Sequence, residues 1–300
     1  MSGPEPSRVP RATKSLRVLV TGISGQQGGQ VARHLLARGH DVRGLTRDPE
    51  SPRLEEIRAN GVTLVTGDFD QPATLARAAK GVDAMFLMST PRGGTEAEAR
   101  EGIAGVEAAK QAGVPWLVFS SVANADRNTG IPHFESKYAV EQHLGRSGVP
   151  HAVSAPTAFF DNYTSPFQLP SIRQGKVAAA TSPDRKVQMV AVENLGAFVT
   201  LLLENPARFA GQRIDVASDA VSGAEVARVL SEVTGRSIEF QPIPLEALRA
   251  QNPDFAKMYE FMERVGYSAD LERVRRQYPE VGWLGFRAWA ASRDWSRLLA

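Results

Sequence analysis

Three glycines follow the first apolar run of the chain at intervals of three residues. The run LRVLV leads directly into TGISGQQGG, in which the glycines are Gly22, Gly25 and Gly28. In a dinucleotide-binding turn the first glycine allows the sharp bend, the second lets the backbone approach a pyrophosphate, and the third lets the next helix pack on the strand. The helix N-terminus then offers free N–H donors and the positive end of a dipole to phosphates. The segment therefore predicts a dinucleotide site rather than a plain glycine turn.

A cationic side chain follows the second apolar run, DVRGLT. Arg47 stands about twenty residues after Gly28, where an NAD site carries an acid that binds the ribose 2′-hydroxyl. A guanidinium group at this place binds a 2′-phosphate through paired hydrogen bonds. Asp48 lies one residue past the usual place of the acid. The pattern favours NADP over NAD, and a solvated surface arginine is the alternative interpretation of Arg47.

The elements that must position these residues alternate between two kinds. Six short apolar runs, LRVLV, DVRGLT, VTLVT, DAMFLM, WLVFS and HAVSA, are separated by helical patterns. Such alternation predicts an α/β, Rossmann-type parallel sheet with helices on both faces. The helical patterns end at glycines that suit a left-handed C-terminal cap, namely Gly39, Gly61, Gly81, Gly113 and Gly148.

The chain is expected to have three parts. Residues 1–15 contain three prolines and no apolar core of a signal peptide, and they are interpreted as a disordered leader. Residues 16–155 form the nucleotide-binding domain, and residues 156–300 form a smaller C-terminal α+β lobe that partly shares the sheet. Ligands of such sheets bind at the carboxyl ends of the strands, so the two parts are expected to frame a substrate cleft.

Composition excludes several classes of function. The 300 residues include no cysteine, which excludes disulfides and thiolate chemistry, and the five histidines show no metal-ligand spacing, so no metal site is expected. No apolar run is long enough for a membrane span. The net charge of +2 arises within residues 1–15, and a neutral body is a poor partner for nucleic acid. These features favour a cytoplasmic protein that acts on a small molecule.

The motifs TGISGQQGG, LTRDP, VTGDFD, FSS, HFESK and PTAFFDN occur in this order between residues 21 and 162. Together they resemble the NmrA-like family, atypical members of the short-chain dehydrogenase/reductase superfamily. The resemblance covers about residues 16–300 and implies a Rossmann-type domain, a smaller lobe and a ligand between them. It also implies the residues expected to contact the cofactor, which are Gly22, Ser24, Gly25, Gln27, Gly28, Arg47, Asp68, Phe69, Ser89, Thr90, Lys137, Phe159, Phe160 and Asn162.

The resemblance gives these residues separate roles. The glycine segment holds the phosphates and the nearby ribose, while Arg47 meets the 2′-phosphate. Asp68 and Phe69 border the adenine, and Ser89 and Thr90 face the middle of the cofactor. Lys137 bonds to the nicotinamide ribose, and the segment of Phe159, Phe160 and Asn162 lines the nicotinamide end. A turn cap for Asp68 and an ordinary core position for Phe159 are the alternatives.

The catalytic motif of the superfamily is altered here. Ordinary short-chain dehydrogenases use Tyr-x-x-x-Lys, in which the lysine lowers the pKa of the tyrosine and the tyrosine donates a proton. This chain reads His133-Phe-Glu-Ser-Lys137, with the spacing and the lysine kept. Tyr138 lies about 100° around a helix from Lys137 and does not replace the missing phenol. Ser120 and Ser121 stand where the superfamily carries its catalytic serine, or else satisfy the end of a buried strand.

Three interpretations remain open for this site. His133 acts as the general acid, since imidazole titrates near neutral pH. Alternatively the acceptor is a quinone-like molecule that needs little protonic help, or the site binds NADPH without turnover. The sequence thus predicts an NADPH-dependent reductase of a small aromatic or quinone-like acceptor, with Lys137 and His133 as catalytic residues. A non-catalytic NADP(H)-sensing regulator that acts through protein partners is the alternative.

The second lobe offers two weaker signals. Its aromatic and methionine side chains form either a pocket wall or, as we prefer, the core of the lobe; they are Tyr163, Phe167, Tyr259, Phe261, Met262 and Tyr267. The stretch FAKMYEFMERVGY has apolar residues at helical spacing and is a candidate contact for a homodimer.

Overall fold

Seven parallel strands form the main sheet of the computed structural model, which describes residue 12 and residues 14–90 and 93–300. Their order across the sheet is β10-β6-β5-β4-β1-β2-β3. The bounds are β1 Arg17–Val20, β2 Asp41–Thr46, β3 Thr63–Thr66, β4 Ala84–Leu87, β5 Leu117–Ser120, β6 His151–Pro156 and β10 Arg213–Val216. All neighbouring pairs are parallel, so the carboxyl ends of the strands meet at one edge of the sheet.

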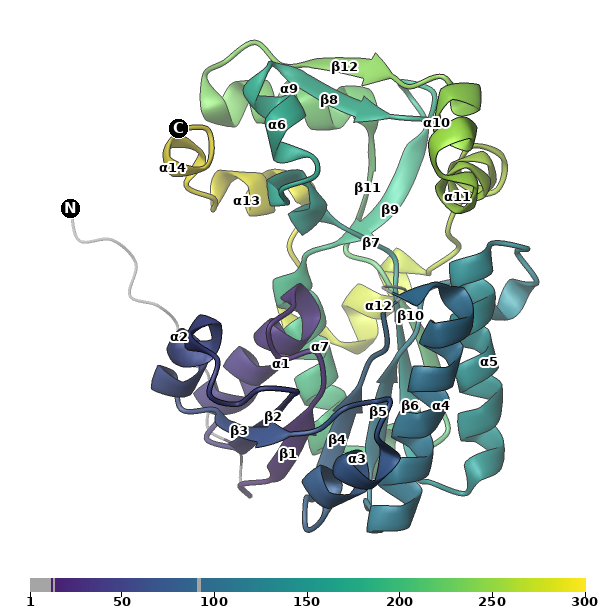
Figure 1. The fold of residues 1–300 in the computed structure, drawn as a ribbon. Helices are drawn as coiled ribbons and strands as arrows, with labels where there is room; N and C mark the ends of the chain where they lie inside the picture. The colour runs from purple at the N-terminus through teal and green to yellow at the C-terminus, as the bar shows by residue number, and fades with distance from the viewer. Residues whose placement is uncertain (1–11, 13, 91–92) are drawn as a thin grey trace, which may run out of the picture.

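Helices cover both faces of this sheet (Figure 1). One face carries α1 Gln26–Ala37 and α7 Val192–Glu204, and the other carries α3 Pro72–Ala79, α4 Thr95–Ala112 and α5 Pro132–Ser147. The strands are apolar on both sides for this reason: in β1, Val18 and Val20 join the core under α1, while Leu19 joins the opposite core. The short elements η1 Pro52–Leu54, α2 Glu55–Ala59 and α8 Pro206–Phe209 complete this domain.

A smaller lobe stands beyond the carboxyl edge of the sheet (Figure 1). It contains a three-stranded sheet in the order β11-β9-β7 and a parallel pair of β12 and β8. The strand bounds are β7 Ala158–Phe159, β8 Lys176–Ala179, β9 Lys186–Val190, β11 Asp219–Ser222 and β12 Glu239–Pro242. The helix bounds are α6 Leu169–Arg173, α9 Gly223–Thr234, α10 Leu245–Gln251, α11 Pro253–Arg264, α13 Phe286–Ala291 and α14 Trp295–Leu298.

The chain enters the lobe three times. It first enters the lobe after β6 and returns to the main domain for α7 and β10. It enters the lobe again at β11 and returns for α12 Leu271–Gln277 and η5 Pro279–Val281. Helices α13 and α14 form the third visit. Val274 and Val281 accordingly pack in the core under α7, whereas Phe286 and Trp295 pack in the core of the lobe. The expected border at residue 155 therefore marks only the first place where the chain leaves the main domain. Later residues return to that domain, where they form strand β10 and the covering helices α7 and α12.

The predicted fold class is confirmed, since the alternating pattern gives a parallel sheet covered on both faces. The five glycines expected as C-terminal caps all have positive φ, between 67° and 96°. The pattern did not predict β8 and β12, which are short and pair across about sixty residues of chain. Near the end of the chain, α13 and α14 are separate helices, because the carboxylate of Asp294 accepts a hydrogen bond from Arg297 N and starts a new helix.

Most of the predicted leader, residues 1–11 and 13, lies outside the described residues. Its last part contacts the domain: Ala12 N donates to Arg38 O over 3.0 Å, and the Ser15 hydroxyl donates to Gly39 O over 2.9 Å. Within the described chain, every helix is too short or too polar to cross a lipid bilayer.

Candidate functional site

Among the described residues, none offers an acceptor to the first amides of α1. Gly25 is the N-cap residue, no side chain caps the helix, and its first turn holds no acidic residue. Ser24 and Gly25 are exposed at this point. The uncapped amides and the positive end of the helix dipole suit an anionic group.

Close backbone contacts explain the glycines. Gly22 has φ of 64°, and a Cβ on Gly28 would lie only 2.3 Å from the carbonyl oxygen of Gly22. Helix α1 can therefore lie against the turn after β1 only with glycine at that position. Gly25 is less crowded, since its Cβ would lie 3.2 Å from the same oxygen. This geometry fits a phosphate of a dinucleotide, which needs bare amides at close range.

Residues after the next strands lie at the same edge. Arg47 follows β2 and is exposed, with no partner among the described residues, so its guanidinium group is available to an anion. Asp68 follows β3, where its carboxylate accepts a hydrogen bond from Asp70 N over 3.1 Å. That contact is the turn cap named above as the alternative, and it engages one of the two carboxylate oxygens of Asp68. Phe69 packs partly against the core beneath α3.

Lys137 is the centre of a buried polar group after β4. Its Nζ donates to the carbonyl oxygen of Ser89 over 2.5 Å and lies 3.0 Å from Oε1 of Glu98. The Glu98 side chain is only 1% exposed, and its other oxygen accepts a hydrogen bond from the hydroxyl of Ser136 over 2.6 Å. Thr90, the next residue after Ser89, is half-buried at this edge.

Two glycines of α4 allow this contact. A Cβ on Gly102 would lie 2.4 Å from a methyl group of Val140 in α5, and one on Gly105 would lie 2.5 Å from Leu87 in β4. The helices α4 and α5 thus approach closely enough for Glu98 to reach Lys137. Burial lowers the pKa of Lys137, and the negative charge of Glu98 acts in the opposite direction.

His133, one helical turn before Lys137, is turned toward the lobe. Its Nδ1 lies 2.8 Å from Oδ1 of Asp254 in the first turn of α11. The Phe255 ring stacks on the imidazole with 6.2 Å between ring centroids. The imidazole is therefore held between the two parts of the chain rather than standing as an isolated helix-start residue.

The two serines at the end of β5 are engaged by other side chains. The hydroxyl of Ser120 donates to Oε1 of Gln27 over 2.6 Å, so this amide of the glycine segment points toward the sheet. The hydroxyl of Ser121 donates to Glu141. Both hydroxyls are thus paired with side chains of α1 and α5.

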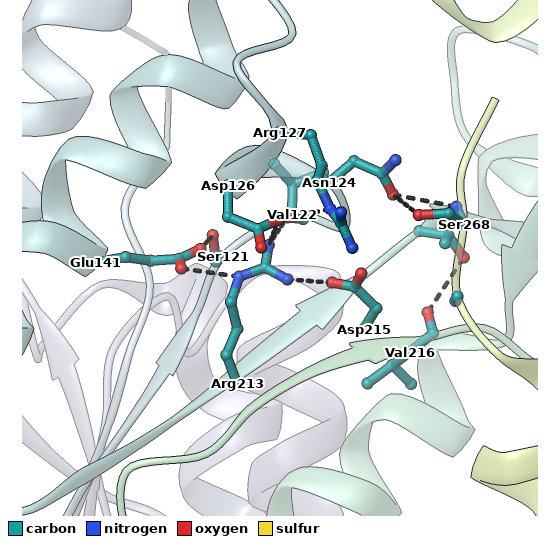
Figure 2. A network of polar contacts seen from close by, with 12 residues as sticks. Ser121, Val122, Asn124, Asp126, Arg127, Glu141, Arg213, Asp215, Val216 and Ser268 are labelled. Carbon is teal, nitrogen blue, oxygen red and sulfur yellow. Dashed lines mark hydrogen bonds and ion pairs between the residues drawn. The ribbon is translucent and has the colours of Figure 1, made fainter. Parts of the chain in front are cut away.

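Glu141 belongs to a network around Arg213 (Figure 2). The Arg213 guanidinium group lies 2.8 Å from Glu141, 3.5 Å from Asp126 and in contact with Asp215, and it also donates to the carbonyl oxygen of Val122. Burial raises the pKa values of Glu141 and Asp215, although Arg213 lowers both. This network holds the segment between β5 and α5, and hence the start of the helix that carries His133 and Lys137.

The nicotinamide-end residues differ in their surroundings. Phe159 is half-buried in β7 and Asn162 is exposed in η4 Phe160–Thr164. Phe160 is fully buried and packs against Phe286 and Trp289, with 5.3 Å and 5.7 Å between ring centroids. Its expected place beside the cofactor is corrected, since a side chain enclosed by the core of the lobe does not reach a ligand.

The other aromatic side chains divide between core and surface. Tyr163 packs in the lobe core, and Tyr267 stacks on Phe134 of α5 with 6.1 Å between ring centroids. Phe167 is 85% exposed and belongs to neither group. Met262, part of the candidate dimer contact, is buried against the domain beside Phe134, so this face of α11 is used within the chain.

Sequence reasoning did not identify Glu98, Asp254 or Arg213. Glu98 lies 39 residues before Lys137, and Asp254 lies 121 residues after His133. No local spacing signals either contact, because both arise from helices that meet only in the folded chain. Across the described residues, histidines and carboxylates form no group of three or more that could hold a metal ion.

Comparison with known proteins identifies the family. The model of the NmrA-like family matches residues 14–289. An NmrA-like family domain-containing protein of Dictyostelium discoideum is 28% identical, with 84% of this chain and 89% of that protein covered. A (4-alkanoyl-5-oxo-2,5-dihydrofuran-3-yl)methyl phosphate reductase of Streptomyces griseus is 30% identical, with 93% and 96% covered. An NAD(P)H azoreductase of Xenophilus azovorans is 29% identical, with 76% and 78% covered.

Solved structures share the fold at lower identity. The triphenylmethane reductase of Citrobacter sp. has a TM-score of 0.76 at 23% identity, covering 92% of this chain and 100% of that one. The NADPH-dependent quinone oxidoreductase QOR2 of Escherichia coli, solved with NADPH, has a TM-score of 0.76 at 21% identity, covering 91% and 98%.

Proposed function

The chain belongs to the NmrA-like family, and on that premise we propose that it is an NADPH-dependent reductase of a small, aromatic or quinone-like acceptor. The observation that carries the proposal is the buried Lys137. A lysine held by Ser89 and Glu98 beside the carboxyl edge of the sheet is placed to bind the ribose of a nucleotide that lies across that edge.

Other residues at the carboxyl edge of the sheet also suit this cofactor. The uncapped amides at the start of α1 suit the pyrophosphate, and the free guanidinium group of Arg47 suits a 2′-phosphate. NADPH, when bound, supplies a hydride. The residues of this chain bind and orient it, and His133 or a bound water supplies the proton that accompanies the hydride.

The relatives support reduction of an acceptor over a purely regulatory role. Two of them are called reductases, one of a furanone phosphate and one of azo compounds, and the two similar structures are of enzymes that reduce a dye and a quinone. These acceptors share conjugated, electron-poor groups that accept a hydride readily. A conjugated acceptor is therefore the class we propose for this chain, while a homodimer and a cytoplasmic location stay predictions.

The test is oxidation of NADPH by the purified protein with a panel of quinones, azo dyes and conjugated lactones. We expect turnover on at least one acceptor, lost in Lys137→Ala and kept in Lys110→Ala, which removes an exposed lysine of α4. Calorimetry on the same proteins separates binding from turnover. Tight NADPH binding with no turnover on any acceptor would instead support the sensing regulator, and no binding at all would overturn both.

A further inference from the structure

We infer that Asp254, supplied by the C-terminal lobe, is a positioning residue that fixes the tautomer and orientation of His133 for proton donation. This inference rests on the proposed reductase function. It means that the C-terminal lobe contributes to the proton-transfer step, in addition to any contact that the lobe makes with the acceptor.

Three contacts hold the imidazole. Nδ1 lies 2.8 Å from the Asp254 carboxylate, and both side chains are largely buried, at 22% and 29% exposure. The ring of Phe134 meets the imidazole edge-on at 4.9 Å, and Phe255 stacks on it. A ring held by one hydrogen bond and two aromatic neighbours has little freedom to rotate, so Nε2 points in a fixed direction.

The Asp254 contact also decides which nitrogen carries a proton. An ionised carboxylate only accepts hydrogen bonds, so Nδ1 must be the donor. In the neutral ring Nε2 is then bare, and in the imidazolium ion Nε2 carries the second proton. Nε2 is thus the position from which His133 gives up and regains a proton.

Other charged groups of α5 and α11 make no contact with the imidazole among the described residues. On α5, Glu135 accepts a hydrogen bond from Gly130 N and Lys137 pairs with Glu98. On α11, Lys257 and Glu260 line a surface pocket with Gly130. Among the described residues, Asp254 is therefore the carboxylate that bonds to this imidazole.

The resulting proton step is balanced. A quinone receives a hydride from NADPH, and its oxygen receives the proton from Nε2 of the imidazolium ion, giving hydroquinone and NADP⁺. The imidazole is left neutral, with the Nδ1 proton still on the ring and hydrogen-bonded to Asp254, and a proton from solvent restores Nε2. An aspartate that orients histidine in this manner keeps the ring in the tautomer that the transfer needs.

The experiment compares the wild type with Asp254→Asn and Asp254→Glu in the full chain. Nitrogen-15 NMR of the histidine rings, with His133→Gln to assign the signal, reports the tautomer without any cofactor. We expect a neutral Nδ1–H ring in the wild type and in Asp254→Glu. In Asp254→Asn the amide can donate to Nδ1, so the Nε2–H tautomer should grow. A wild-type ring protonated at Nε2 when neutral would overturn the inference.

Kinetics with 1,4-naphthoquinone give a second readout. Asp254→Asn should lower kcat by roughly 10-fold to 100-fold while the Kd for NADPH stays within about twofold, and Asp254→Glu should recover part of kcat. Glu246→Gln, which removes an exposed first-turn carboxylate from the neighbouring α10, should leave kcat unchanged. An unchanged kcat in Asp254→Asn would also overturn the inference. If the wild type neither binds NADPH nor turns over, the proposed function fails, and the tautomer measurement still decides the role of Asp254.

Discussion

The amino group of Lys137 lies 3.0 Å from the carboxylate of Glu98, across the contact between α5 and α4. The pair is enclosed by the close packing at Gly102, and the Ser136 hydroxyl donates to the same carboxylate. Removal of one partner from a buried ion pair leaves an uncompensated charge, which costs about 3–5 kcal/mol.

Glu98→Gln should therefore lower the free energy of unfolding at pH 7 by about that amount. The pKa of Lys137 is already lowered by burial, and loss of the Glu98 charge lowers it further. A lysine whose folded-state pKa lies below its unfolded value destabilises the fold while it is charged, and this cost is relieved as the pH rises through the folded pKa. The defect should shrink between pH 7 and pH 10 in urea unfolding curves. Glu96→Gln, in the same helical turn but exposed, is the matched control.

Arg47→Ala should change the cofactor preference. The guanidinium group has no protein partner among the described residues, so its loss should affect ligand binding and not stability. Loss of charge-assisted hydrogen bonds costs about 1.5–3 kcal/mol, which is about 10-fold to 100-fold in Kd for NADPH. The Kd for NADH should not change. Calorimetry with both nucleotides measures this, with the exposed Arg53→Ala as control; equal weakening of both nucleotides would contradict the assignment of Arg47 to the 2′-phosphate.

Gly28→Ala should disrupt the start of α1. The new Cβ would meet backbone atoms of Gly22 at 2.3 Å and 2.6 Å, which cannot move aside as a flexible side chain can. We expect a loss of about 1–3 kcal/mol in unfolding free energy together with loss of NADPH binding. Gly29→Ala is the matched control, since its Cβ would make only an ordinary contact at 3.6 Å. That variant should be more stable by about 0.5–1 kcal/mol, as expected for glycine to alanine inside a helix.

Arg213→Met should make stability depend strongly on pH. The variant leaves Glu141 and Asp215 without their cation, while Asp126 keeps Arg127 at 3.8 Å (Figure 2). Burial already raises the pKa values of Glu141 and Asp215, and the loss of Arg213 raises them further.

A carboxyl group with a raised folded-state pKa stabilises the fold below its unfolded pKa, and that stability is lost as the pH rises through the folded pKa. The Tm of Arg213→Met should therefore be lowered most at pH 8 and recover toward pH 5. Arg228→Met, which breaks an exposed pair with Glu232, should leave the Tm nearly unchanged at either pH, because water screens an exposed ion pair. A Tm deficit of Arg213→Met that is equal at pH 5 and pH 8 would contradict this account.

Local sequence patterns account for most of the main domain. The runs that end at Thr46, Ser120 and Ala155 become strands nearly as delimited, because each is rich in apolar residues that the sheet buries. The lobe was less predictable. Strands β8 and β12 have no clear alternation, and they form because tertiary packing brings Lys176–Ala179 beside Glu239–Pro242.

The residues of the candidate site also fall into those that local motifs predict and those that only the folded chain reveals. Gly22 and Gly28 are placed by a short motif, and the structure gives them the turn and the close contact that this motif predicts, while the role of Arg47 stays a prediction. The partners of Lys137 and His133 are not encoded by spacing, because Glu98 and Asp254 reach them from distant helices. Phe160 was assigned to the ligand from its motif, and only the packing of Phe286 and Trp289 reveals that it is enclosed.

The three separate visits of the chain to the lobe have a consequence for how such proteins diversify. Residues 158–190 and 219–269 are extensions between elements that the sheet itself needs, including β10, α7 and α12, and residues 284–300 form a third extension after η5. Recombination at one junction cannot exchange the lobe, but changes of length and side chain within each extension can reshape it while the coenzyme half stays intact. New acceptor specificities should therefore arise by gradual changes within these three extensions.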